Sequence, residues 1–113
     1  MELSNLVIND GAIKKMISKP GSLEVYFEDW QENTWSIVFE DVIAFESLGA
    51  EGEELSEIKV ADTGEYKIKV LRLFPDESEA KCRIYSFVSA WSGLSVLQVL
   101  ADKVTVGRML DEL

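Results

Sequence analysis

Carboxylates fill the central third of the chain, and they are the side chains with the most chemistry to offer. Eleven acids and no Lys or Arg lie between Pro20 and Ile58; they are Glu24, Glu28, Asp29, Glu32, Glu40, Asp41, Glu46, Glu51, Glu53, Glu54 and Glu57. The rest of the chain holds ten acids and eleven bases, so this segment carries nearly all of the net charge of −10. Charge concentrated in this way creates a field that attracts basic surfaces and repels polyanions. We therefore expect a basic protein or a cation as partner, and neither nucleic acid nor an anionic membrane.

Catalysis by these residues is not what the sequence predicts. The chain has no histidine, which excludes Ser-His and Cys-His nucleophiles and an imidazole base. No segment orders its acids as a calcium-binding loop does, and a glycosidase needs a cleft between two placed carboxylates that a small sheet protein hardly offers. We predict a protein that is not an enzyme, with no metal site and no cofactor.

The single cysteine, Cys82, is interpreted as a buried apolar residue. Its neighbours Lys81 and Arg83 could lower a thiol pKa, but on an alternating strand they point to the opposite face. One cysteine cannot form an internal disulfide, which fits a reducing compartment. With neither a secretion signal nor a membrane-length apolar run in its 113 residues, the chain is expected to be a soluble cytoplasmic protein.

Length and composition predict one domain spanning residues 1–113. A chain of this size buries about two-thirds of its unfolded surface and needs no metal or disulfide to hold a core. Ile13, Met16 and Ile17 have helical spacing, so we expect a short helical stretch there, capped by Asn9 or Asp10 and ended by Pro20 and Gly21.

From Leu23 the apolar period changes to two, which predicts a β-hairpin over residues 23–28 and 35–40. Residues opposed in a sheet share a face, so Val25 or Phe27 must meet Phe39 or Ile37 across an odd-numbered loop. A loop over residues 32–34 sets Glu40 against Tyr26, whereas one over 30–34 sets it against Glu24. Like charges destabilise a pair, so we favour the shorter loop, with Asn33 as its left-handed residue.

Asp41 interrupts the apolar face that this strand would continue through Phe45. A bend or edge at Asp41 is the favoured explanation, and a buried carboxylate with a raised pKa is the alternative. Residues 47–64 are expected to be a long connection with one helical turn. A second hairpin is predicted from residues 66–70 and 82–88, with Lys67, Lys69, Lys81 and Arg83 on its outer face.

The C-terminal segment fits two patterns. Residues 94–106 suit either a helical stripe or a strand, and we favour a strand that pairs back on residues 82–90 through the turn at 91–93. Residues 108–113 are expected to form a short helix. The predicted fold is therefore a single α+β domain dominated by an antiparallel β-sheet of five or six strands, with a short N-terminal helical element.

The acids have two explanations that the sequence leaves open. If both hairpins share one sheet, the outward lysines neutralise some of the hairpin acids. The acids of the connection and of the hairpin tip then form a free negative surface for a partner. Trp30 and Trp91 lie at predicted turns, where an exposed tryptophan can anchor an interface. The predicted contact residues are Asp29, Trp30, Glu32, Glu51, Glu53, Glu54 and Glu57.

Several local patterns give the chain a resemblance to a known group of proteins. They are a W-x4-W pair beginning at Trp30, the FEDV-x-x-F step from Phe39, the G-x-E-G-x-x-L-S connection from Gly49, and the Y-x-F-x-S-A-W run from Tyr85. Over most of residues 23–106 the chain resembles small immunity proteins of bacterial polymorphic toxin systems. The resemblance implies a compact cytoplasmic protein that binds one toxin domain and blocks it, and it assigns no residue a role.

Two functions follow as expectations. The first is a non-enzymatic, immunity-type module whose acidic face occludes a basic toxin domain, with a nuclease as the expected class. The alternative is an accessory protein that either self-associates as a homodimer or binds a small ligand, and whose acids serve only solubility.

Overall fold

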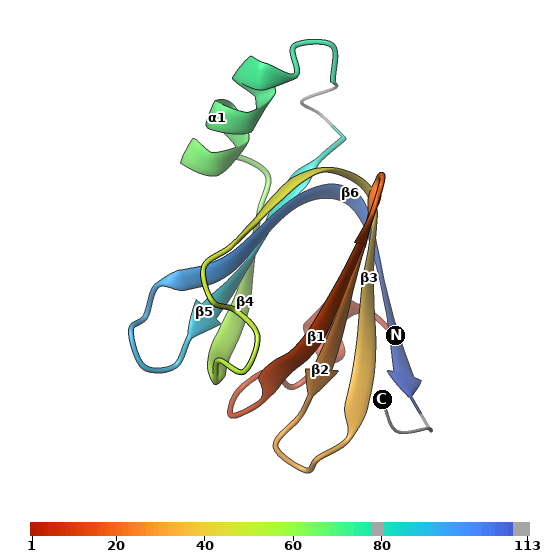
Figure 1. The fold of residues 1–113 in the computed structure, drawn as a ribbon, viewed down its shortest axis with the longest axis vertical. Helices are drawn as coiled ribbons and strands as arrows, with labels where there is room; N and C mark the ends of the chain where they lie inside the picture. Colours follow the sequence, from red (N-terminus) through yellow and green to blue (C-terminus); the bar gives the residue numbers. More distant parts are fainter. Residues whose placement is uncertain (78–80, 110–113) are drawn as a thin grey trace.

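One six-stranded antiparallel sheet forms the body of the protein. The computed structural model describes residues 1–77 and 81–109 (Figure 1). In chain order, the elements are a 3₁₀ turn at Leu3–Asn5, β1 (Ala12–Lys19), β2 (Ser22–Glu28), β3 (Thr34–Ser47), β4 (Leu55–Ala61), α1 (Glu65–Leu73), β5 (Arg83–Ser89) and β6 (Ser95–Met109). The strand order across the sheet is β1-β2-β3-β6-β5-β4. The predicted α+β class and the antiparallel sheet of five or six strands are confirmed.

The two longest strands bend, and the bend folds the sheet over its own core. β3 and β6 arch together in Figure 1, so that β1 and β2 lie on one arm and β4 and β5 on the other. A bulge at the arch leaves Ile43 between the pairs formed by Val42 and Ala44. Asp41 sits just before it with a positive φ of 53°, and its exposed carboxylate lies 3.5 Å from Lys103 Nζ. The predicted bend at Asp41 is confirmed, and its carboxylate is not buried.

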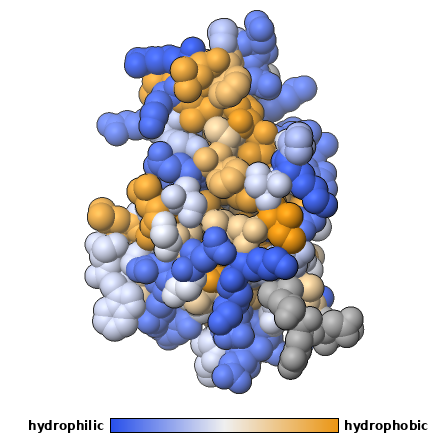
Figure 2. Space-filling model, viewed as in Figure 1, coloured by the Kyte–Doolittle hydropathy of each residue, from blue (hydrophilic) through white to orange (hydrophobic). Residues whose placement is uncertain are grey.

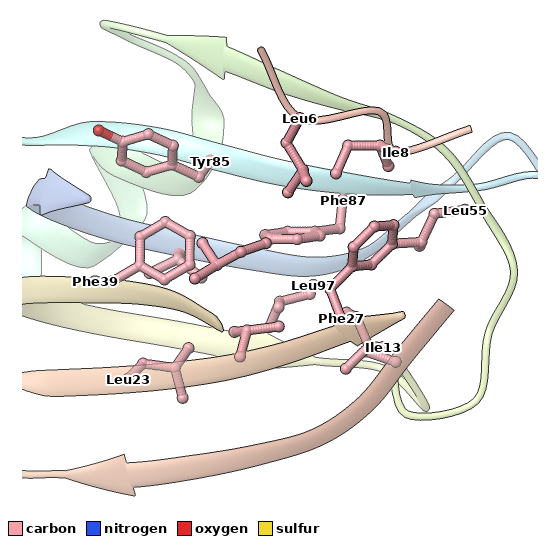
Figure 3. Packing of buried hydrophobic residues seen from close by; sticks show 14 of the residues in the cluster. Leu6, Ile8, Ile13, Leu23, Phe27, Phe39, Leu55, Tyr85, Phe87 and Leu97 are labelled. Carbon is pink, nitrogen blue, oxygen red and sulfur yellow. The ribbon is translucent and has the colours of Figure 1, made fainter. Parts of the chain in front are cut away.

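The main core fills the space between the two arms (Figure 3). Phe39 of β3 lies against two aromatic residues of β5, with ring centroids 5.1 Å from Tyr85 and 6.2 Å from Phe87. The N-terminal segment adds Leu6 and Ile8 to the same cluster. Burial of these side chains supplies the main driving force that holds the arms together.

Strand β1 occupies the segment where the sequence predicted a helix, so that prediction was wrong. A bulge between Ile13 and Lys15 shifts the register, so Ile13 opposes Phe27 while Met16 opposes Val25. The bulge therefore places residues three apart on one face of a strand, which produces the spacing of a helix. The 3₁₀ turn at Leu3–Asn5 is the short helical element near the N-terminus.

Helix α1 stands where the second hairpin was expected to begin. The strand predicted over residues 66–70 is wrong. Tyr66 and Val70 are four residues apart, a spacing that fits one face of a helix as well as one face of a strand, and in the structure they form the face of α1 that packs on Ile84 and Leu100. The strand predicted over 82–88 corresponds to β5. β5 pairs with β6, as the sequence predicted, and on its other side with β4. The sequence assigned the β4 segment to a connection with one helical turn, and that assignment was also wrong.

The β2–β3 hairpin has the predicted faces and a different register. Val25 pairs with Ile37, whereas Glu40 pairs with Ser22 rather than with either residue predicted. The connecting loop is residues 29–33, and its left-handed residue is Glu32, with a φ of 66°, rather than Asn33. Near the C-terminus, the strand preferred over a helix is confirmed as β6. The helix predicted over 108–113 is wrong at Arg108 and Met109, which belong to β6, and residues 110–113 lie outside the described residues.

Candidate protein-interaction surface

Three loops and the start of β1 meet at the end of the molecule opposite α1 (Figure 1). Ala12 pairs with Glu28 on one side and bridges Glu54 on the other, which joins the β2–β3 hairpin to the segment before β4. The Ala90 N–H donates to Glu54 O at 2.9 Å, which adds the β5–β6 turn. We call this surface the loop end and define it as residues 9–12, 29–33, 48–54 and 90–94.

The loop end holds six acids and no Lys or Arg. They are Asp10, Asp29, Glu32, Glu51, Glu53 and Glu54. Six of the seven predicted contact residues therefore share this surface, namely these acids without Asp10, together with Trp30. Figure 2 shows a mostly hydrophilic surface toward this end of the visible face. Glu57 is the exception among the predicted residues, because it lies beyond these loops on β4, opposite Val88.

Asp29 organises the hairpin tip rather than standing free in solvent. One of its carboxylate oxygens accepts the N–H groups of Gln31 and Asn33, each at 2.9 Å, and the other accepts Trp35 Nε1–H at 3.0 Å. Burial acts to raise the pKa of Asp29, but the hydrogen bonds from Trp35, Asn33 and Gln31 outweigh it and lower that pKa below its ordinary 3.8. The Asp29 side chain stabilises the five-residue loop, because it accepts hydrogen bonds from two backbone N–H groups of the loop and from the indole of Trp35.

We expect Asp29→Ala to destabilise the fold by about 1–2 kcal/mol at pH 7, below the full value of three charge-assisted bonds because water screens this site. The folded-state pKa is lowered, so this stabilisation is present above pH 3.8 and is lost as the pH falls through the lowered value. Urea unfolding of both proteins at pH 7 and at pH 3 measures the difference. If the free energies of unfolding of the two proteins differed by the same amount at both pH values, the role given to the ionised carboxylate would be contradicted.

Glu53 connects two of the loops. Its carboxylate accepts the Ser89 hydroxyl at 2.5 Å, and Ser89 Oγ in turn accepts the N–H groups of Trp91 and Ser92, each at 3.2 Å. Ser89 is almost fully buried. Glu53 therefore orients the β5–β6 turn, while Glu32 and Glu51 are exposed acids.

Exposed apolar side chains lie among these acids. Trp91 is 80% exposed and Trp30 59% exposed, at the tips of their turns. Leu48 and Leu94 are also largely exposed, and the Leu48 N–H donates to Val96 O, which holds the end of β3 beside the start of β6. An exposed tryptophan among unpaired acids is suited to anchoring a basic protein surface. The sequence predicted the tryptophans and missed both leucines and Asp10.

The bases expected on the second hairpin form no ion pair with the hairpin acids Glu24, Glu28 and Glu40 among the described residues, although Lys69 pairs with Glu46. Lys67 and Lys69 lie on α1, at the other end of the molecule. Among the described residues, the ion pairs are Lys69–Glu46 at 3.9 Å, Arg83–Asp62 at 3.1 Å and Lys103–Asp41 at 3.5 Å. None of these pairs includes an acid of the loop end. Arg108 of β6 contacts the hairpin tip, where its Nη2 donates to Asn33 Oδ1 at 2.8 Å.

The part of the chain that the structure describes was also predicted to contain a buried cysteine and neither a metal site nor a membrane span. No group of three or more acids or cysteines there is arranged to hold a metal ion. Cys82 is buried, as predicted. No helix within the described ranges combines the length and the apolar character needed to cross a bilayer. Comparison with protein-family models, with curated proteins and with solved structures finds no match to this chain.

Proposed function

We propose that this protein is a non-enzymatic binding module of immunity type, which neutralises a basic toxin domain by covering its active surface. The observation that carries the proposal is the loop end, where six acids and two exposed tryptophans share one surface that holds no base. A nuclease is the expected target class, because a groove that binds phosphates must be rich in Lys and Arg. An acidic surface that fits such a groove excludes the nucleic acid.

The charges and the aromatic residues have different roles in this proposal. Acids free of ion pairs steer a basic partner and fix its orientation, and this contribution falls as salt screens it over about 8 Å at physiological ionic strength. Trp30 and Trp91 supply the apolar contact area that holds the complex once it has formed. Asp29 and Glu53 act indirectly, because their hydrogen bonds hold the two turns that present these tryptophans.

The proposal predicts a partner that is captured at low salt and lost on charge reversal. The tagged protein would be immobilised, exposed to host lysate at low and high salt, and the captured proteins identified. We expect capture of a basic toxin domain whose activity the protein inhibits at one-to-one stoichiometry. Glu32→Lys/Glu51→Lys should abolish this capture at low salt.

A matched control separates the loop end from total charge. Asp76→Lys/Glu77→Lys changes the net charge by the same amount, from −10 to −6, in the turn after α1. This control should retain capture and inhibition. Equal loss in both variants would mean that net charge alone is responsible, and a captured protein that is not inhibited would contradict the immunity role. Capture of nothing would favour the accessory alternative.

A further inference from the structure

Strand β4 leaves one edge of the sheet open. It pairs with β5 on one side and is the last strand in the sheet order. Its first residue bonds to the segment just before β1, where Leu55 N–H donates to Gly11 O at 2.8 Å and Asp10 N–H donates to Leu55 O at 3.0 Å. Beyond Leu55, no described segment other than β5 makes a backbone hydrogen bond with β4. An open edge of this kind is a template for another strand.

The two edges of the sheet differ in their protection. β1, the opposite edge, has a register shift between Ile13 and Lys15 and carries Lys14, Lys15 and Lys19. Bulges and lysines on an edge strand discourage pairing with a second chain. In β4 the register shift lies at its start, between Leu55 and Glu57, and residues 57–61 pair regularly with β5. β4 is therefore the less protected edge.

Apolar surface lies beside this edge. A groove of about 370 Å³ runs between the N-terminal segment and β4, lined by Leu3, Val7, Ile58 and Val60 among others. Val7 is 55% exposed and Val60 is 50% exposed. Ile58 opposes the buried Phe87 and Val60 opposes the buried Tyr85, so both belong to the core-facing side of the strand. A strand added at this edge would cover apolar area as well as satisfy backbone groups.

The charges of β4 complement a second copy of the same strand in one register. Two copies of β4 related by a two-fold axis pair antiparallel. Opposed residues point to the same face of the sheet only when the axis lies between one residue and the same residue of the second copy. An axis at Glu57 opposes two glutamates, and an axis at Lys59 opposes two lysines. An axis at Ile58 opposes Glu57 to Lys59 twice, and like charges directly opposed are destabilising whereas opposite charges stabilise.

We propose that β4 pairs with β4 of a second copy about a two-fold axis at Ile58, which joins two sheets edge to edge. Both Glu57–Lys59 pairs then lie on the outer face, while Ile58 meets Ile58 and Val60 meets Ser56 on the core-facing side. The pairing uses residues 56–60 and leaves the hairpin tip at 29–33 and the turn at 90–94 open. The inference is therefore independent of the function proposed above.

Charge swaps test this register directly. Sedimentation of the full chain over a concentration series at low salt should reveal a species of twice the 12.7 kDa chain mass. Glu57→Lys and Lys59→Glu each turn both attractive pairs into repulsive ones, and each should weaken the dimer by about tenfold or more. Mixing the two variants should restore association, because every opposed pair is then complementary. The double swap Glu57→Lys/Lys59→Glu should also restore the homodimer.

A control variant on the other edge strand and hydrogen exchange of the edge amides test whether β4 itself forms the contact. Lys14→Glu on the β1 edge is the matched control, and it should leave association unchanged. Hydrogen exchange of the amides in residues 56–61 should slow as protein concentration rises, whereas β1 amides should not respond. A monomer at every concentration, single swaps that associate like wild type, or a mixture that fails to recover would each overturn the β4 pairing.

Discussion

Gly11→Ala should destabilise the fold by about 3 kcal/mol, the upper part of the range for overpacking. A Cβ at this position would overlap the Phe27 ring and lie 2.7 Å from Glu28 O, which is backbone and cannot move aside cheaply. Gly11 also donates to Ile8 O and accepts Leu55 N–H, so it cannot retreat without losing the contact between β1 and β4. Chemical denaturation of both proteins measures the change in free energy of unfolding.

The comparison that isolates this clash is Gly107→Ala on β6. There a Cβ meets only Ser36 Oγ, at 3.4 Å, and the change should be nearly neutral. Gly11→Ala/Phe27→Leu should be less destabilised than the sum of its single variants, because the smaller side chain removes the ring overlap. If Gly11→Ala costs no more than Gly107→Ala, the close approach at Gly11 does not exist.

Lys67→Met should destabilise the fold by about 1–3 kcal/mol, because it removes the donor from the carbonyl group of Cys82, which is buried, and from that of Asp62, which belongs to an exposed residue. Lys67 is 4% exposed, and its ammonium donates to Asp62 O at 2.6 Å and to Cys82 O at 2.9 Å. These bonds tie the segments before α1 and before β5 to the helix, which otherwise packs on the sheet through few residues such as Val70. Methionine keeps the length and apolar area of the stem and deletes the charge and donors.

The matched control for this variant lies two residues along the same helix. Lys69 is 69% exposed and faces Glu46 at 3.9 Å, so Lys69→Met should change stability by no more than about 0.5 kcal/mol. Thermal and urea unfolding of both variants test the difference. Equal effects in the two would mean that the ammonium of Lys67 does not bridge the two carbonyl groups.

The sequence predicts the fold best where burial alternates with a strict period. Val25 and Phe27 on β2, with Ile37 and Phe39 on β3, give the strands, their shared face and the hairpin. The prediction from sequence fails where the apolar spacing fits both a helix and a strand, or where a bulge interrupts the alternation of a strand. Tyr66 and Val70 suit a strand and a helix equally, and Ile13 and Met16 share a face only because a bulge intervenes. In such segments tertiary pairing decides the structure.

The sequence predicts most of the residues that form the candidate surface, but it does not predict that they lie together in the fold. The run of acids and the turn tryptophans can be found in the sequence, whereas their joining depends on Ala12 lying between Glu28 and Glu54. That bridge follows from the bend of the whole sheet. The sequence indicates the bend at Asp41, but not which residues it brings together. Two acids also proved to have internal partners, since Asp29 and Glu53 each accept hydrogen bonds that shape a turn.

The central claim is that the loop end is the docking surface for a basic partner. The measurement that tests it most directly is the association rate with the captured toxin domain, followed by stopped flow at low and at high salt. We expect Glu32→Lys/Glu51→Lys to lower the association rate at low salt by about tenfold and to remove most of its salt dependence, while Asp76→Lys/Glu77→Lys has little effect. Rates that are equal in wild type and both variants would show that the acids of the loop end do not guide binding.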